Sequence, residues 1–169
     1  EYRIWHKNNV VAYGDSTWAM LDIAKRTPIR ANTLLNNIEV ADEMVFGTHR
    51  HKQPVSKEVA YSHTHITNKS DADFNHHVTN MTYLYACLAA LPTEYQESHS
   101  VTELGIWFKQ ESFIGESMEC TVYATEEPDL WNFRIVTAGE RVSCLATIRY
   151  ADKPEAVTNM LNDNLEIRQ

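Results

Sequence analysis

Residues 70–80 read Ser70-Asp71-Ala72-Asp73-Phe74-Asn75-His76-His77-Val78-Thr79-Asn80, a stretch with two carboxylates, two carboxamides and two imidazoles. A long apolar segment follows directly. Residues 78–91 contain no Gly, no Pro and no charge, and apolar side chains recur there at helical spacing. The recurring side chains are Met81, Leu84, Tyr85, Leu88 and Ala89. We therefore expect a helix that is buried on most sides and ends at Pro92.

A polar cluster at the start of a buried helix has two interpretations. Asp73 or Asn75 could simply cap the helix, as Asp and Asn commonly do. Alternatively, the free backbone N–H groups and the positive end of the helix dipole could stabilise a developing negative charge in a functional site. The cluster holds more polar groups than capping needs, which favours the functional interpretation.

Composition excludes several classes of protein. The net charge of −8 argues against a nucleic-acid-binding protein, because phosphate binding needs a basic surface. No apolar run is long enough to span a membrane, and the first residues carry no signal-peptide pattern. The cysteines are odd in number and far apart, which indicates buried free thiols in a reducing, cytoplasmic setting. These three residues are Cys87, Cys120 and Cys144.

Strand patterns flank the predicted helix. One strand is expected over residues 59–67, and four more follow the helix at residues 101–111, 117–124, 130–137 and 142–150. The short connections favour antiparallel pairing. The sequence therefore predicts an α+β fold in which an antiparallel sheet wraps around one central helix.

The polar stretch resembles the S-D-x-D-x-N-x-H-V-x-N-x-x-Y signature of the plant and bacterial acyl-ACP thioesterases, with Tyr83 as its last residue. Glu103-Leu104 followed by Lys109-Gln110-Glu111 is similar to a later segment of that family, in which a strand ends in a catalytic glutamate. A third similarity runs from Trp18 to Pro28. These segments occur in the family's order, and together they extend over residues 1–150.

The resemblance implies a tandem of two hotdog domains, each a sheet curled around a helix. Residues 55–150 would then form a complete second hotdog domain. Residues 1–30, which pattern as hairpin strands, would be the last strands of a first domain that is truncated in this chain. Residues 31–54 would be a linker with a short helix near residues 41–45, and residues 151–169 a polar tail with a helical turn near residues 156–161.

The resemblance also implies a hydrolase that releases a fatty acid from acyl-ACP during fatty acid biosynthesis, without a cofactor. Its catalytic residues would be Asp73, Asn75, His77 and Glu111. Trp18, Tyr83 and Ser112 would contact the substrate. The partner would be an acyl carrier protein that carries the fatty acyl chain, docked on a local basic patch despite the acidic chain, and a homodimer is left open.

Three positions depart from the family's pattern, namely Ala72, Thr79 and Ser112. Ser112 stands where the plant enzymes carry a cysteine, and no second base accompanies it, so we expect water to attack the thioester. His77 or Glu111 could take the proton from water, and the sequence does not decide between them. Asn75 and the helix N–H groups could stabilise the oxyanion, while Asp73 orients the site.

Other interpretations remain open at this point. His63 and His65 share one face of a strand and lie near His76 and His77 in sequence, which is compatible with a zinc site, although no Cys completes it. By strand parity Glu111 lies opposite the apolar row of its strand, so it could be a solvated charge. Finally, the fold could serve an acyl-CoA thioesterase or a non-catalytic acyl-binding or assembly module.

Overall fold

The structure, a computed structural model, describes residues 1–22, 24–25, 27–30 and 57–154. The chain divides into two units, residues 1–50 and residues 51–169, and each is described by itself. The predicted linker of residues 31–54 and its short helix lie outside the described residues. So does most of the predicted polar tail, with its helical turn.

The described residues of the first unit form two small antiparallel hairpins. β1 (Tyr2–His6) pairs with β2 (Asn9–Gly14), and β3 (Met20–Asp22) pairs with β4 (Thr27–Ile29). Lys7 adopts a positive φ of 54° in the tight turn between β1 and β2. The hairpin strands expected from the sequence are thus present. An isolated two-stranded hairpin is only marginally stable in water.

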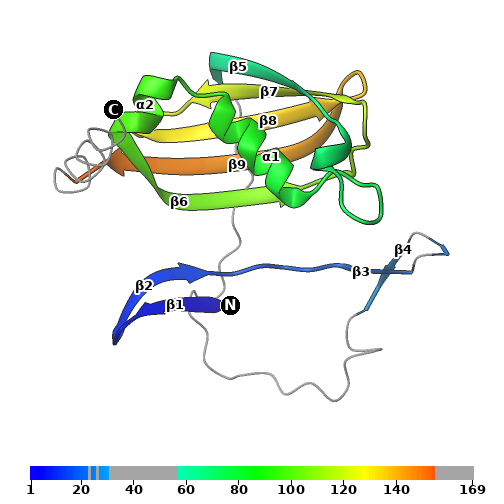
Figure 1. Ribbon diagram of the computed structural model, residues 1–169, viewed down its shortest axis with the longest axis horizontal. Coiled ribbons are helices and arrows are strands. Elements are labelled where there is room, and N and C mark those ends of the chain that lie inside the picture. The colour runs from blue at the N-terminus through cyan, green and yellow to red at the C-terminus, as the bar shows by residue number, and fades with distance from the viewer. Residues whose placement is uncertain (23, 26, 31–56, 155–169) are drawn as a thin grey trace, which may run out of the picture. The chain divides into compact units, whose positions relative to one another are not determined.

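The second unit is a five-stranded antiparallel sheet in the order β5-β7-β8-β9-β6 (Figure 1). Its strands are β5 (Glu58–Ile66), β6 (His99–Phe108), β7 (Ser117–Ala124), β8 (Leu130–Thr137) and β9 (Arg141–Asp152). Each predicted strand is present. The main difference is that β6 ends at Phe108, three residues before the predicted end at Glu111. β5 and β6 form the two edges of the sheet.

The described part of the second unit also contains three short or medium helices. The 3-10 helix η2 (Lys69–Asp71) precedes α1 (Asn80–Ala89), and α2 (Thr93–Ser98) leads into β6. α1 lies across one face of the sheet (Figure 1). The predicted α+β arrangement of an antiparallel sheet around one helix is therefore confirmed.

The buried face of α1 differs from the predicted one. Of the predicted apolar row, Met81 and Tyr85 are 49% and 62% exposed, whereas Leu84 and Leu88 are partly buried against the core. The side chains that face the sheet are instead mostly small, and they include Thr82, Ala86 and Cys87. Small side chains let the helix backbone approach the sheet closely, and Tyr83 is the one large side chain among the buried residues of α1.

The core lies between α1 and alternate residues of β7, β8 and β9. These residues include Met118, Cys120, Val122, Phe133, Ile135, Cys144, Ala146 and Ile148, all at most 1% exposed. All three cysteines are free and buried, as expected. The hydrogen bond to Cys120, together with burial, raises the pKa of the Cys87 thiol, and burial raises the pKa of Cys144 to about 12. These thiols are therefore protonated and contribute to packing.

Candidate active site

The loop before α1 holds Asp73 and His77 in a tight turn. The backbone N–H of His76 donates to the Asp73 carbonyl at 3.1 Å, and His76 adopts a positive φ of 63°. The Asp73 carboxylate accepts the backbone N–H groups of Asn75 at 2.8 Å and of His77 at 3.1 Å. The residue that precedes α1 is Thr79. Asp73 and Asn75 therefore stabilise this turn, and the interpretation that either caps the helix is wrong.

The Asp73 carboxylate is held in its charged form. Desolvation opposes this, but the N–H groups of His77 and Asn75 outweigh it and lower the pKa of Asp73. Asp73 therefore remains a hydrogen-bond acceptor throughout the physiological pH range. It accepts a hydrogen bond from the backbone N–H of His77 and thereby fixes the backbone position from which the imidazole extends.

At the end of β6 the chain bends, and this bend brings Glu111 toward the loop. The N–H groups of Lys109 and Gln110 both donate to the carbonyl of Ser143, at 2.8 and 3.3 Å. Two successive N–H groups that donate to one partner carbonyl form the hydrogen-bond pattern of a β-bulge. A bulge changes the direction of the side chains that follow it. Strand parity no longer applies at Glu111, because the regular strand has already ended.

His77 and Glu111 form the centre of the site. Nδ1 of His77 lies 3.8 Å from Oε1 of Glu111, and both side chains are partly exposed. The ring of Phe113 packs edge-on against the His77 imidazole, with 5.5 Å between the centroids. The backbones of His77 and Phe113 also form an antiparallel bridge. The structure thus places the His77 imidazole beside the Glu111 carboxylate and packs the imidazole against Phe113.

A cavity of about 310 Å³ opens beside this pair. Its lining comes from the loop, the start of α1 and the end of β6, and comprises Asp73, His77, Val78, Asn80, Tyr83, Phe108, Lys109, Gln110 and Glu111. The lining therefore combines polar and charged groups with apolar and aromatic ones. That combination suits a ligand with a reactive polar group next to an apolar portion.

The three residues that we expected to contact the substrate lie in different parts of the structure, namely Tyr83, Ser112 and Trp18. Tyr83 lines the cavity and packs against Phe108, with 5.6 Å between the ring centroids. Burial raises the pKa of its phenol although a hydrogen bond to Ser112 opposes this, so the hydroxyl stays protonated. Ser112 itself is 0% exposed and donates to Oγ1 of Thr137 at 3.4 Å, away from the cavity lining. Trp18 belongs to the first unit, where its indole N–H donates to Ser16.

Asn75 is brought near the pair only through Asp73. Its side chain is exposed and is not part of the cavity lining. Five other residues line the cavity and were not among the expected site residues: the polar Asn80, Lys109 and Gln110, and the apolar Val78 and Phe108. Asn80 could have been suspected, because it is the last polar residue of the signature and the first residue of α1.

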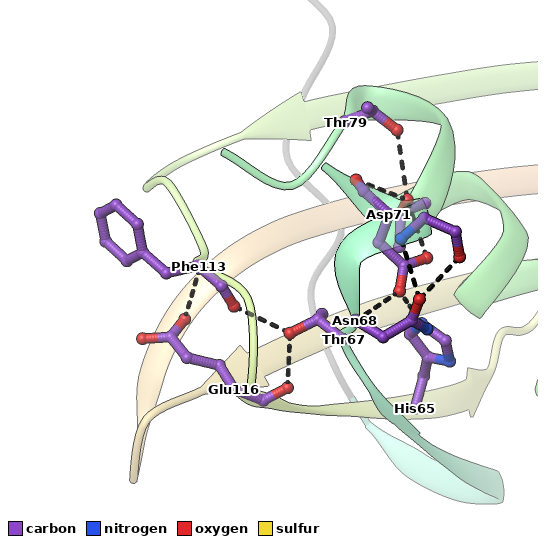
Figure 2. A network of polar contacts seen from close by, with 9 residues as sticks. His65, Thr67, Asn68, Asp71, Thr79, Phe113 and Glu116 are labelled. Atoms are coloured by element: carbon purple, nitrogen blue, oxygen red, sulfur yellow. Dashed lines mark hydrogen bonds and ion pairs between the residues drawn. The ribbon is translucent and has the colours of Figure 1, made fainter. Parts of the chain in front are cut away.

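The remaining histidines near the site do not assemble a metal centre. His65 pairs with Asp71, whose Oδ2 lies 3.0 Å from Nε2 of the imidazole (Figure 2). Within the described residues no three His, Cys, Asp or Glu side chains are arranged to hold a metal ion. None of the described helices is long and apolar enough to cross a membrane.

Comparison with known families identifies the second unit. The model of the acyl-ACP thioesterase C-terminal domain matches residues 54–152, more than half of the chain. The chain belongs to the acyl-ACP thioesterase family. A comparison with curated protein sequences finds no significant match.

Solved structures of acyl-ACP thioesterases share the fold. An acyl-ACP thioesterase from Bacteroides thetaiotaomicron is 18% identical with a TM-score of 0.60, and the match covers 78% of this chain and 53% of that one. The 12:0-ACP thioesterase from Umbellularia californica is 14% identical with a TM-score of 0.63, covering 79% and 53%. A Lactobacillus plantarum protein described as an oleoyl thioesterase is 19% identical with a TM-score of 0.62, covering 80% and 55%.

These likenesses establish the fold of this thioesterase-family chain as a hotdog, in which an antiparallel sheet surrounds a helix. The chain spans about half the length of the solved thioesterases that it matches.

Proposed function

We propose that this chain hydrolyses the thioester of a fatty acyl group carried by acyl carrier protein and releases the free fatty acid for lipid biosynthesis. The observation that carries the proposal is the His77–Glu111 pair, 3.8 Å apart at the wall of a cavity of about 310 Å³. Membership of the acyl-ACP thioesterase family supports the choice of substrate.

In this mechanism water is the nucleophile. The His77–Glu111 pair accepts a proton from water as the oxygen attacks the carbonyl carbon of the thioester. The tetrahedral intermediate collapses, the C–S bond breaks, and the proton passes from the pair to the departing thiolate. The products are a carboxylic acid and the free thiol of the carrier. Glu111 supports this step because a carboxylate beside an imidazole stabilises the imidazolium form.

The negative charge that develops on the thioester oxygen needs hydrogen-bond donors. The first turn of α1 supplies backbone N–H groups and the positive end of the helix dipole, and Asn80 at this position lines the cavity. We assign Asn75 a supporting role, because its N–H donates to the Asp73 carboxylate that also holds the N–H of His77. Tyr83 and Phe108 form the aromatic part of the cavity, against which the acyl chain packs.

Ser112 is not a nucleophile in this proposal. Its side chain is fully buried and hydrogen-bonded to Thr137, which keeps it from an incoming thioester. We assign Ser112 the role of supporting Tyr83 through their hydrogen bond. Water is therefore the attacking group.

The proposal is tested by incubating the purified chain with palmitoyl-ACP and, in parallel, with palmitoyl-CoA, and by following free thiol and free fatty acid. We expect equal release of both products, with the higher kcat/KM for the ACP substrate. A preference for the CoA thioester would reassign the carrier. Binding of acyl-ACP without any release would favour the non-catalytic acyl-binding module.

A further inference from the structure

Thr67 directly follows β5 and is only 2% exposed. Its backbone N–H donates to the Glu116 carbonyl at 3.0 Å, and its carbonyl accepts the N–H of Gly115 at 2.9 Å. Its hydroxyl oxygen lies 2.8 Å from the Phe113 carbonyl oxygen and 3.0 Å from that of Glu116. Thr67 therefore holds one short turn with its backbone and with its side chain.

That turn, residues 113–116, follows closely after Glu111. The N–H of Glu116 donates to the Phe113 carbonyl at 3.2 Å, and Gly115 has a φ of +89°, as a type II turn requires at its third residue. The Glu116 carboxylate accepts the N–H of Phe113 at 3.0 Å and is paired with Arg141 at 2.9 Å. The turn is thus rigid, and Thr67 connects it to β5.

The turn determines how Glu111 faces His77. Residues 112 and 113 run beside residues 77 and 78, where the Val78 N–H donates to the Ser112 carbonyl at 3.0 Å and His77 bridges Phe113. A displacement of the turn would shift this segment, and with it Glu111 and the Phe113 ring. The hydrogen bonds of Thr67 go to this turn, so the Thr67 side chain can affect the pair through this segment.

The next residue, Asn68, holds the other half of the site. Its N–H donates to Oδ2 of Asp71 at 2.8 Å, and the carbonyl of Asp71 accepts the N–H of Thr79 at 2.8 Å. Figure 2 shows Thr67 and Asn68 between the turn on one side and Asp71 with Thr79 on the other. The end of β5 is therefore a common anchor for the loop that carries His77 and the segment that carries Glu111.

We propose that Thr67 is a positioning residue that sets the distance between His77 and Glu111, an inference that rests on the proposed hydrolase function. Its hydroxyl is the group that matters. Without it each of the two carbonyls keeps one hydrogen bond, to the Glu116 N–H or to the Thr67 N–H, so the unit still folds while the turn loosens. Small displacements of catalytic groups cost large factors in rate.

The test compares Thr67→Val with Thr67→Ser in the full chain. Valine keeps the shape and removes the hydroxyl, so kcat on palmitoyl-ACP should fall roughly tenfold to a hundredfold with KM little changed. Serine restores the hydroxyl and should recover most of kcat. A change in KM with kcat unaltered would overturn the role of the hydroxyl. An equal loss of kcat in Thr67→Val and Thr67→Ser would also overturn it.

Thr125 provides a matched control at the opposite end of β7. Its hydroxyl also contacts two backbone carbonyls of one turn, those of Glu127 at 3.0 Å and Leu130 at 2.9 Å. Thr125→Val therefore removes the same kind of group, roughly 26 Å along the strand from Thr67's turn. We expect its kcat to be unchanged. If both valine variants lose the same activity, Thr67 supports only the stability of the fold.

A double variant tests whether Thr67 acts through Glu111. In the Glu111→Gln background, Thr67→Val should lower kcat less than about twofold further, because the interaction that it positions is already lost. Full additivity of the two effects would contradict the proposal.

A crystal structure of Thr67→Val separates this inference from the proposed function. We expect the His77–Glu111 separation to exceed the 3.8 Å of the parent chain, with no change in the Thr125→Val structure. Should the parent chain hydrolyse no thioester, the hydrolase proposal fails while the structures still decide the positioning role. An unchanged separation in Thr67→Val would refute that role even in an active enzyme.

Discussion

At the level of single residues, the site depends on the directions in which the side chains of His77 and Glu111 point. His77 starts from a turn that the Asp73 carboxylate holds through two backbone N–H groups. Glu111 reaches it because β6 ends in a bulge at Lys109 and Gln110. Neither side chain would face the other in a regular strand and helix, so these local irregularities create the site.

Glu111→Gln tests the carboxylate itself. The change preserves size and hydrogen bonding but removes the charge that stabilises the His77 imidazolium. We expect kcat to fall by a factor of about a hundred or more, with KM little changed, as for an interaction made only in the transition state. Steady-state kinetics on acyl-ACP would measure this. A fully active Gln variant would remove Glu111 from the mechanism.

Ser112→Ala tests the nucleophile. Because Ser112 is buried and water attacks in our mechanism, the variant should keep most of its kcat once any loss of stability is taken into account. Mass spectrometry of the enzyme during turnover should show no added acyl group. An acyl-enzyme on Ser112 in the parent chain would contradict the water mechanism.

Asp71 makes stability depend on pH. Burial opposes its ionisation, but the Asn68 N–H and the His65 imidazole outweigh this and lower the pKa of Asp71. A carboxyl whose pKa is lowered by folding stabilises the fold above its ordinary pKa of about 3.9, and that contribution is lost as the pH falls through the lowered value. Asp71→Asn should therefore cost about 1–2 kcal/mol at pH 7.

The same difference should shrink as the pH falls below about 4, since the parent chain then loses the contribution as well. Urea unfolding of both proteins at pH 7 and pH 3 measures this. Equal free energies of unfolding at pH 7 would show that the Asp71 network does not stabilise the fold.

Part of the site could be predicted from the sequence. The signature pointed to Asp73 and His77. Both residues lie in one loop, so residues that are close in the sequence are also close in the folded chain. Strand parity placed Glu111 outward, and only the resemblance pointed to it, because the bulge depends on a carbonyl of Ser143 far along the chain. The signature already contained Asn80, whereas Lys109 and Gln110 could not be selected, since a cavity is a property of several elements at once.

At the scale of elements, strands were easier to predict than the orientation of the helix. Alternating patterns identified the five strands of the second unit, and the inward rows of β7, β8 and β9 pack into one core. For α1, apolar periodicity alone selected Met81 and Tyr85 for the interior. The requirement for close approach to the sheet instead selects small residues such as Ala86 and Cys87.

Two alanines of α1 test this packing. Ala86 is 4% exposed against the sheet, whereas Ala89 is exposed on the other side. Ala86→Leu should overpack the interface and cost about 1–3 kcal/mol of unfolding free energy. Ala89→Leu should change it by less than about 0.5 kcal/mol. Denaturant unfolding of the pair checks the orientation, and equal effects would mean that α1 is turned differently.

At the scale of the whole molecule, the second unit contains the complete His77–Glu111 pair and its cavity. The first unit contributes hairpin strands and Trp18, and the chain covers about half of the solved acyl-ACP thioesterases that it matches. In the proposed mechanism the second unit therefore supplies both members of the catalytic pair, His77 and Glu111.

The most direct test replaces each of two neighbouring histidines by asparagine and measures thiol release from acyl-ACP. His76 is exposed and has a positive φ of 63°, which asparagine tolerates, so His76→Asn should retain nearly the full rate. His77→Asn removes the imidazole beside Glu111 and should lower kcat by about a hundredfold or more while the melting temperature stays close to that of His76→Asn. Equal rates in the two variants would contradict the account.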